Sequence, residues 1–296
     1  MAPRLRADAI RNVSAESVAR FALFNFTDSN LPLLIARMHL YNAAMLEWWQ
    51  YALLTLAGAA GGFIDAIAGG GGLITVPALL WAGLPAQLAL GTNKLQSSCG
   101  TMLAVFRYTR AGLIQWRTLR LALVVTFIGA ALGAWAVTRI APDVLARIVP
   151  ALLVGVAIYT AANPGLGGRT RPARIGLVAF AIVFGMLLGF YDGFFGPGTG
   201  SFWMLACVLA RGQDLRAATG TTKALNLTSN LASLIAFALA GCLRGDVGAA
   251  MIAGQLVGAR LGSGLVVARG ATIIRPIFIA TALALAMRVA WLAFAG

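Results

Sequence analysis

The chain of 296 residues contains only two lysines, and each ends a similar short sequence. Lys94 ends GTNK (91–94), and Lys223 ends GTTK (220–223), whereas all other basic residues apart from one histidine are arginines. An ammonium group is costly to bury in an apolar chain, so such a residue is a candidate for a functional site. The duplicated pair predicts one site built from two halves of an internal repeat.

The two halves match elsewhere as well. The segment 62–65 (GFID) matches 189–192 (GFYD), and the glycine run 69–72 matches 196–199 in the same register. After a short insertion the register is again constant, so that the stretch from Gly91 to Gly133 matches the stretch from Gly220 to Gly262. A constant register over so long a stretch predicts two homologous halves, a usual construction of secondary transporters with the substrate site at the repeat interface.

The composition is that of an integral membrane protein, with 60% hydrophobic residues, 11% charged residues and a mean hydropathy of +0.85. We predict an all-α polytopic fold with about eight transmembrane helices, because apolar stretches recur near the length that a spanning helix needs. They lie at 48–66, 95–111, 119–139, 145–162, 175–192, 222–240, 246–267 and 272–293. The shorter segments 70–83 and 198–210 predict a glycine-rich broken or re-entrant helix in each half. Whether they cross the membrane decides between parallel and inverted halves, and the sequence leaves both open.

The expected organisation is an N-terminal extension (1–46), a first membrane repeat (47–162), a connecting loop (163–174) and a second membrane repeat (175–296). Polar residues interrupt the apolar part of the extension, so it fits a signal peptide poorly. Two interpretations remain. The start is assigned too early and Met45 is the initiator, or the segment is a disordered or interfacial cytoplasmic extension.

The net charge of +14 does not indicate nucleic-acid binding, because the arginines of the membrane part lie mostly in short loops. The loops 107–120 and 169–174 are arginine-rich and should be cytoplasmic by the positive-inside rule. The three cysteines lie apart in apolar segments and lack metal-ligand spacing, so we expect them to pack as small apolar side chains. Neither a cofactor nor a metal is expected.

Asp65 and Asp192 are equivalent positions, and each ends an apolar segment just before a glycine-rich break. Each carboxylate could cap or order the break. Each could instead bind a coupling proton or sodium ion. The sequence does not separate these roles.

The glycine runs allow two interpretations. Where such a run opens a helix, its amides and the positive end of the helix dipole form an anion site, which would include Gly71, Gly72, Gly198, Thr199 and Ser201. Alternatively, the small residues permit a tight helix crossing. A further glycine face at 254, 258 and 262 predicts close helix packing, with Gln255 beside it as a weak site candidate.

The lysines and their polar neighbours complete the candidate substrate site. Two ammonium groups and two half-helix N-termini would form a strongly electropositive centre that suits a small anion. The lysines could instead snorkel to lipid headgroups from helix ends. The candidate residues on these segments are Thr92, Asn93, Lys94, Thr221, Thr222, Lys223 and Asn226.

Four phrases together resemble the TauE/SafE family of sulfite exporters and probable membrane transporters. They are GFIDAIAGGGGLITVP (62–77), GTNK (91–94), GFYDGFFGPGTGS (189–201) and GQLVGARLG (254–262). The resemblance covers roughly 48–293. It implies a multi-pass inner-membrane protein of two related halves that moves small sulfur-containing anions such as sulfite or sulfoacetate.

We therefore expect a secondary transporter that exports a small anion bound between the repeats, with a passive anion channel as the alternative. We expect no enzyme, because the only histidine lies in the extension; a Ser–Lys pair of Ser97 or Ser98 with Lys94 is the one catalytic arrangement the sequence would allow. The expected partners are the anion and the lipid bilayer, with proton or sodium coupling and an oligomeric state that the sequence does not determine.

Overall fold

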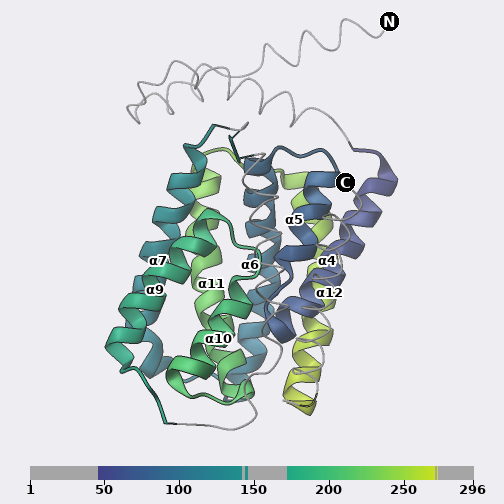
Figure 1. Cartoon of the computed structure of the whole chain (residues 1–296). Coiled ribbons are helices and arrows are strands. Elements are labelled where there is room, and N and C mark those ends of the chain that lie inside the picture. Colours follow the sequence, from purple (N-terminus) through teal and green to yellow (C-terminus); the bar gives the residue numbers. More distant parts are fainter. Residues whose placement is uncertain (1–45, 142–143, 146–171, 271, 273–296) are drawn as a thin grey trace, which may run out of the picture. The chain divides into compact units, whose positions relative to one another are not determined.

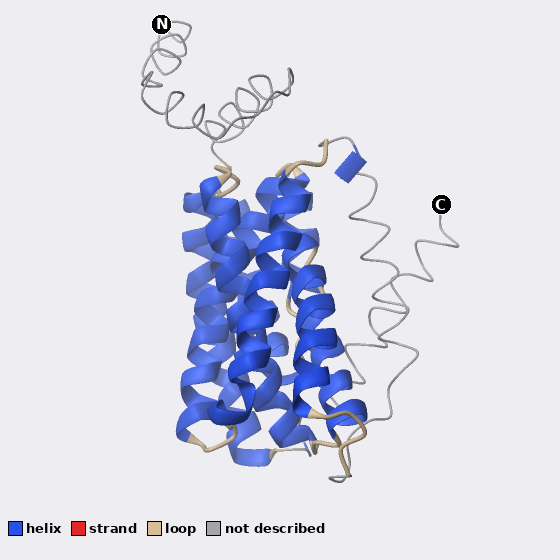
Figure 2. Cartoon of the chain, turned by 90° about the vertical axis from the view of Figure 1, so that its left-hand side faces the viewer, coloured by secondary structure: helices blue, strands red, loops and turns tan. Residues whose placement is uncertain are grey.

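The computed structural model describes residues 46–141, 144, 145, 172–270 and 272, and these residues form a bundle of α-helices without a strand (Figures 1 and 2). Its helices are α4 (Trp48–Ala68), α5 (Gly72–Trp81), α6 (Ala86–Arg110), α7 (Trp116–Thr138), α9 (Leu177–Phe194), α10 (Thr199–Arg211), α11 (Leu215–Leu239) and α12 (Gly245–Arg269). The predicted extension lies almost entirely outside the described residues. So do nearly all of the predicted spans 145–162 and 272–293 and most of the loop 163–174.

Among the described residues, four helices, α4, α7, α9 and α12, are long and apolar enough to cross a membrane. Their exposed side chains include large apolar residues such as Leu56, Phe127 and Ile182. Apolar side chains on the outside of a bundle are what a lipid environment requires. The described residues therefore have the character of a multi-pass membrane protein.

Helices α6 and α11 begin earlier than the sequence pattern predicts. The predicted spans start at 95 and 222, whereas α6 starts at Ala86 after Pro85 and α11 starts at Leu215. The Asp214 carboxylate caps α11 by accepting a hydrogen bond from the amide of Ala217 (3.0 Å). The predicted starts are therefore wrong, because Lys94 and Lys223 lie well inside their helices rather than beside the first residue. The polar residues around them lie inside helices because they face protein partners rather than lipid.

The chain is broken at both glycine runs. Helix α4 ends at Gly69, which has a φ of 75°, and α10 follows Gly198, which has a φ of 83°. Helix α5 turns back along α4, because the ring of Trp81 at its end lies 5.9 Å from the ring of Trp49 at the start of α4. Each break thus forms a hairpin of one long and one short helix.

The predicted glycine face of α12 packs closely on α4. A Cβ atom added at Gly254 would lie 1.8 Å from the carbonyl oxygen of Thr55, and one at Gly258 would lie 1.9 Å from that of Ala59. Near the start of both helices, the Tyr51 hydroxyl donates a hydrogen bond to Asp246 (2.6 Å). Helices α4 and α12 therefore run in the same direction, and the packing interpretation of this face is confirmed.

Helices α6 and α11 run in opposite directions through the centre of the bundle (Figure 1). Gly91 near the start of α6 lies against Phe237 near the end of α11, and Gly220 near the start of α11 lies against Leu113 just after α6. Both helices have 25 residues, and each lysine stands at the same place in its helix, as the predicted repeat requires. The two segments that the sequence predicts to be equivalent therefore cross as an antiparallel pair.

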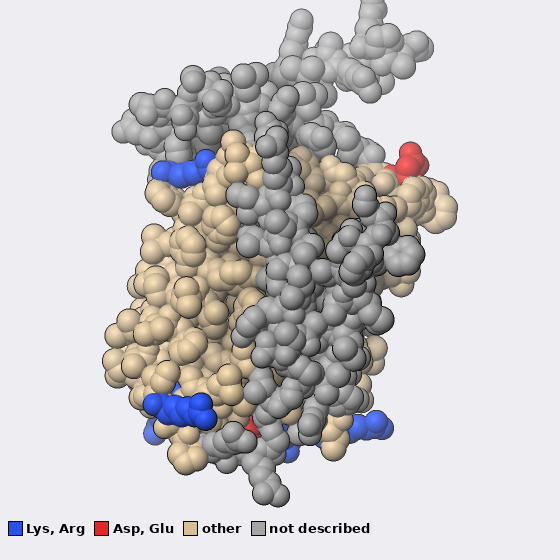
Figure 3. All heavy atoms as spheres, in the orientation of Figure 1, with Lys and Arg blue, Asp and Glu red and all other residues tan. Residues whose placement is uncertain are grey.

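Basic side chains gather at the two ends of the bundle, and the middle of the face shown in Figure 3 carries none among its described residues. The end of α6 contacts the end of α12, since Arg107 donates a hydrogen bond to the carbonyl of Arg260 (2.7 Å). Arg211 bonds the carbonyl of Ile175 at the same end. This end holds Arg107, Arg110, Arg117, Arg120, Arg174, Arg211, Arg216, Arg260 and Arg269, and the opposite end holds Arg139 and Arg244.

Candidate functional site

A small polar cavity lies at the centre of the bundle, where the two glycine breaks meet α6 and α11. Its volume is about 20 Å³, which is room for about one water molecule. Its walls are formed by Asp65, Gly69, Gly71, Gly72, Asn93, Lys94, Ser97, Asp192, Gly196, Gly198, Thr199, Gly200, Asn226 and Asn230. Helix segments from both halves of the sequence thus supply polar groups to one small cavity.

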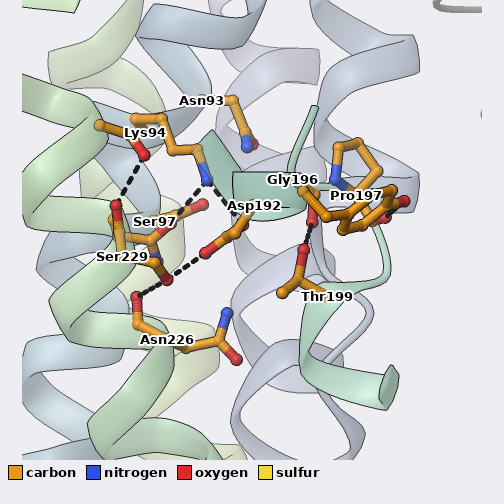
Figure 4. Close-up of polar contacts among 12 residues, drawn as sticks. Asn93, Lys94, Ser97, Asp192, Gly196, Pro197, Thr199, Asn226 and Ser229 are labelled. Atoms are coloured by element: carbon orange, nitrogen blue, oxygen red, sulfur yellow. Dashed lines mark hydrogen bonds and ion pairs between the residues drawn. The ribbon is translucent and has the colours of Figure 1, made fainter. Parts of the chain in front are cut away.

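Lys94 enters this cavity from α6 and forms an ion pair with Asp192 at the end of α9 (Figure 4). The distance from Lys94 Nζ to Asp192 Oδ1 is 2.7 Å, and both side chains are only 2% exposed. Lys94 Nζ also donates to the amide oxygen of Asn230 (3.1 Å), and the Ser229 hydroxyl donates to the second oxygen of Asp192. The ammonium is therefore fully buried rather than snorkelling to a membrane surface.

Lys223 forms the reciprocal pair. Its Nζ atom on α11 lies 2.9 Å from Oδ2 of Asp65 on α4. Each lysine is thus neutralised by the aspartate of the other half of the sequence. The pairs differ in burial, because the Lys223 side chain is fully buried whereas that of Asp65 is 18% exposed.

The two glycine breaks touch each other at the floor of the site. A Cβ atom added at Gly200 would lie 2.5 Å from the Cα of Gly69, so the backbones are in direct contact. The amide of Ser201 donates to the Gly69 carbonyl (2.9 Å). This contact brings the N-termini of α5 and α10 beside the cavity. Amides of both first turns are already bonded to carbonyls of the breaks, for example Leu73 to Gly70 (3.0 Å) and Thr199 to Gly196 (3.1 Å). Both interpretations of the glycine runs, tight crossing and anion site, are compatible with this geometry.

The structure places the predicted site residues in two groups. Those in the cavity wall are Asp65, Gly71, Gly72, Asn93, Lys94, Asp192, Gly198, Thr199 and Asn226. Thr92, Thr221, Thr222, Lys223 and Ser201 are buried but do not line it. Thr92 accepts a hydrogen bond from the amide of Arg244 (2.9 Å), and the Ser201 hydroxyl bonds the carbonyls of Ala68 and Gly69.

Several residues that line or complete the site were not among the predicted binding residues. Ser97 and Asn230 line the cavity, three and seven residues after their respective lysines, so helical spacing was the available signal. Ser229 and Thr101 bond the two aspartates. Nothing local in the sequence shows that these hydroxyls reach carboxylates on another helix.

The Ser–Lys arrangement that the sequence would allow does not form in the described contacts. The Ser98 hydroxyl donates to the backbone carbonyl of Lys94 (2.7 Å), and the Ser97 hydroxyl accepts a hydrogen bond from Gln96 (3.0 Å). The described residues contain no group of three or more histidine, cysteine or acidic side chains placed to hold a metal ion. The chemistry on offer is thus that of paired ammonium and carboxylate groups with amide and hydroxyl neighbours.

Comparisons with known proteins identify the family of the chain. The sequence profile named "Sulfite exporter TauE/SafE" matches residues 54–289. The chain belongs to the TauE/SafE family. It is therefore a multi-pass membrane transporter of this sulfite exporter-like family, and it contains several apolar helices.

Related proteins with curated names are described as probable membrane transporters. The chain is 42% identical to one from Haemophilus influenzae, over 77% of this chain and 89% of that protein. It is 42% identical to one named ORF9 from a Sinorhizobium species, over 82% and 93%, and 43% identical to YfcA from Escherichia coli K12, over 74% and 81%. No solved structure matches the chain significantly.

Proposed function

We propose that this TauE/SafE protein is a secondary transporter that exports a small anion, such as sulfite, sulfoacetate or a related sulfur oxyanion or organosulfonate. One observation carries the proposal. Two ammonium groups are buried inside a membrane bundle, and each is held by a carboxylate that lines the central cavity and comes from the other half of the sequence. A buried charge of this kind inside membrane helices marks a substrate or ion pathway.

The arrangement of helices supports two halves with inverted topology. Helices α6 and α11 are equivalent segments of the repeat and run antiparallel. Their equivalent residues Thr101 and Asn230 contact each other at 3.5 Å, as expected where a pseudo-two-fold axis passes between two repeats. Inverted repeats with broken helices and a site at the midplane are a common construction of secondary transporters.

The anion would bind by taking the place of a carboxylate beside its lysine. In the described state the lysines are already neutralised, and the cavity holds about one water molecule. A polyatomic anion therefore enters only when an aspartate moves away. The positive ends of the α5 and α10 dipoles, with Asn93, Thr199 and Asn226 in the cavity wall, would complete its coordination.

A displaced aspartate also offers a route to coupling. Two ammonium and two carboxylate groups sum to zero charge, so a bound anion leaves the site net negative within the membrane. Binding of a proton or sodium ion by Asp65 or Asp192 would reduce this cost. Without any coupling, a divalent anion leaving an inside-negative cell would still gain ~4.6 kcal/mol at ~100 mV, from two charges at ~2.3 kcal/mol each.

We place the protein in the cytoplasmic (inner) membrane, with its arginine-rich end toward the cytoplasm. The loop after α6 and Arg174 lie at that same end, and an excess of arginine in short loops is typical of the cytoplasmic side. The start of α4 and the loop between α5 and α6 would then face outward.

The alternative is a passive anion channel. A channel needs no carboxylate that leaves its lysine when the anion binds, so Asp65→Asn and Asp192→Asn would leave anion flux intact. A transporter would instead show saturable flux that is stimulated by the same anion on the opposite side of the membrane. Counterflow in proteoliposomes separates the two functions.

The test is efflux of sulfite, sulfoacetate, thiosulfate and sulfate from proteoliposomes containing the full chain. Saturable efflux of one of these anions, lost in Lys94→Ala and Lys223→Ala, is the expected result. Because loss of one lysine leaves a buried carboxylate unpaired, the double variant Lys94→Met, Asp192→Asn serves as a charge-balanced control that should fold and still not transport. Unchanged efflux in all three variants would contradict the proposed site.

A further inference from the structure

The two central ion pairs occupy equivalent positions but have unequal surroundings. Asp192 receives hydrogen bonds from Lys94 and from Ser229, and its side chain is 2% exposed. Asp65 receives a hydrogen bond from Lys223 and a long contact of 3.5 Å from Thr101, and its side chain is 18% exposed. The carboxylate of the first half is thus held by weaker contacts.

The sequence itself creates this inequality. In the register that matches the two lysines, Ser229 corresponds to Gly100, and Asn230 corresponds to Thr101. Gly100 has no hydroxyl to offer Asp65, and the space beside it is filled by Gln255, whose amide nitrogen lies 2.5 Å from the position of an added Cβ. Asn230 accepts a hydrogen bond from Lys94, so Lys94 has two hydrogen-bond partners, Asp192 and Asn230.

Space for a substrate should therefore come from movement of Asp65 rather than of Asp192. The cavity is too small for a polyatomic anion in the described state. Moving Asp192 would break two hydrogen bonds to buried partners and leave Lys94 in contact with Asn230 alone. Moving Asp65 breaks one ion pair and one marginal contact, and the partly exposed side of this carboxylate gives it somewhere to go.

We infer that Asp65 is a built-in competitor of the transported anion: it occupies Lys223 in the empty protein and is displaced when the anion binds, while the Lys94–Asp192 pair stays closed. The inference rests on the proposed anion transport and assigns unequal roles within that site. The charged and titratable groups that face Asp65 are Lys223 of α11, Lys94 and Tyr108 of α6, and Asp192 of α9 across the cavity. Among these described groups, only Lys223 is bonded to it.

A competitor of this kind lowers the apparent affinity for the substrate, because only the fraction of molecules with Asp65 displaced can bind. The variant Asp65→Asn keeps the shape of the side chain and removes its charge, so Lys223 is left available to an anion. If Asp65 is displaced in about a tenth of the wild-type molecules or fewer, the dissociation constant of the anion should fall by about tenfold or more in this variant. Asp192→Asn should bring no such gain.

The experiment is isothermal titration of the purified full chain in detergent with sulfite, sulfoacetate, thiosulfate and sulfate in turn. We expect weak binding of one anion by the wild type, binding about tenfold tighter by Asp65→Asn, and no tightening by Asp192→Asn. Should Asp192→Asn fail to fold, Ser229→Ala takes its place, since it loosens Asp192 without altering any charge, and it too should not tighten binding.

The outcomes separate this inference from the proposed function. Equal tightening by Asp65→Asn and by either second-half variant would overturn the unequal roles but support the anion site. Unchanged or weaker binding by Asp65→Asn would show that Asp65 does not compete with the anion. Absence of binding of all four anions to every variant would overturn the anion site, and this inference with it.

Discussion

Lys94 Nζ lies 2.7 Å from Asp192 Oδ1 although the two residues belong to different halves of the sequence. Because both side chains are buried, removal of one charge leaves the other without compensation. The replacement Lys94→Met should therefore lower the free energy of unfolding by about 3–5 kcal/mol. The addition of Asp192→Asn should restore much of this loss. Thermal unfolding in detergent, followed by tryptophan fluorescence, measures both variants; a double variant as unstable as the sum of the single ones would argue against coupling.

The contact between the glycine breaks leads to a second prediction. Gly200→Ala would place a methyl group 2.5 Å from the Cα of Gly69, so the two breaks must separate and the cavity must change shape. We expect loss of transport together with a loss of stability of about 1–3 kcal/mol. Gly70→Ala is the matched control, because an added Cβ there meets its nearest neighbour at an ordinary 3.8 Å. Equal effects of the two variants on efflux and unfolding would mean that the crossing does not shape the site.

The glycine face of α12 can be tested in the same way. Gly258→Ala would force a methyl group to 1.9 Å from the carbonyl oxygen of Ala59 and should push α12 away from α4. A decrease in the unfolding temperature is the expected result, with a cost of about 1–3 kcal/mol. Gly245→Ala, at the first residue of the same helix and in open space, should change stability by less than about 0.5 kcal/mol. If both variants unfold like the wild type, the close packing of α4 and α12 is not needed for stability.

The sequence predicted much of this architecture for identifiable physical reasons. Apolar length and composition are sufficient to locate α4, α7, α9 and α12, and the glycine runs mark the breaks because positive φ angles at Gly69 and Gly198 favour glycine. The starts of α6 and α11 were missed, because the polar residues before Lys94 and Lys223 resemble a loop unless the neighbouring helices that satisfy them are known.

The candidate site was predicted by residue type but not by pairing. The rarity of lysine and the register of the repeat identified Lys94, Lys223, Asp65 and Asp192. The pairing of each lysine with the aspartate of the other half depends on α6 and α11 running antiparallel. The sequence leaves open whether the halves are parallel or inverted. The difference between a residue in the cavity wall, such as Asn226, and a buried neighbour such as Thr222 depends on helix rotation, which the nearly uniform polarity of these segments does not reveal.

Asn226 and Thr222 allow this last distinction to be tested on one helix. Both carry a buried side-chain oxygen without a hydrogen-bond partner in the described structure, but only Asn226 lines the cavity. Replacing an unpaired buried polar group by an apolar group of similar shape costs little stability. Asn226→Leu and Thr222→Val should therefore both fold, with unfolding temperatures close to that of the wild type.

Transport should separate the two variants. Asn226→Leu removes an amide from the cavity wall and should reduce the ratio of kcat to KM for anion efflux by about tenfold, as expected for loss of a hydrogen bond worth about 1.5 kcal/mol to a charged group. Thr222→Val should leave efflux unchanged. Normal efflux by Asn226→Leu would place the anion elsewhere along α6 and α11, whereas a defect in Thr222→Val would mean that the transporting state rotates α11 relative to the described one.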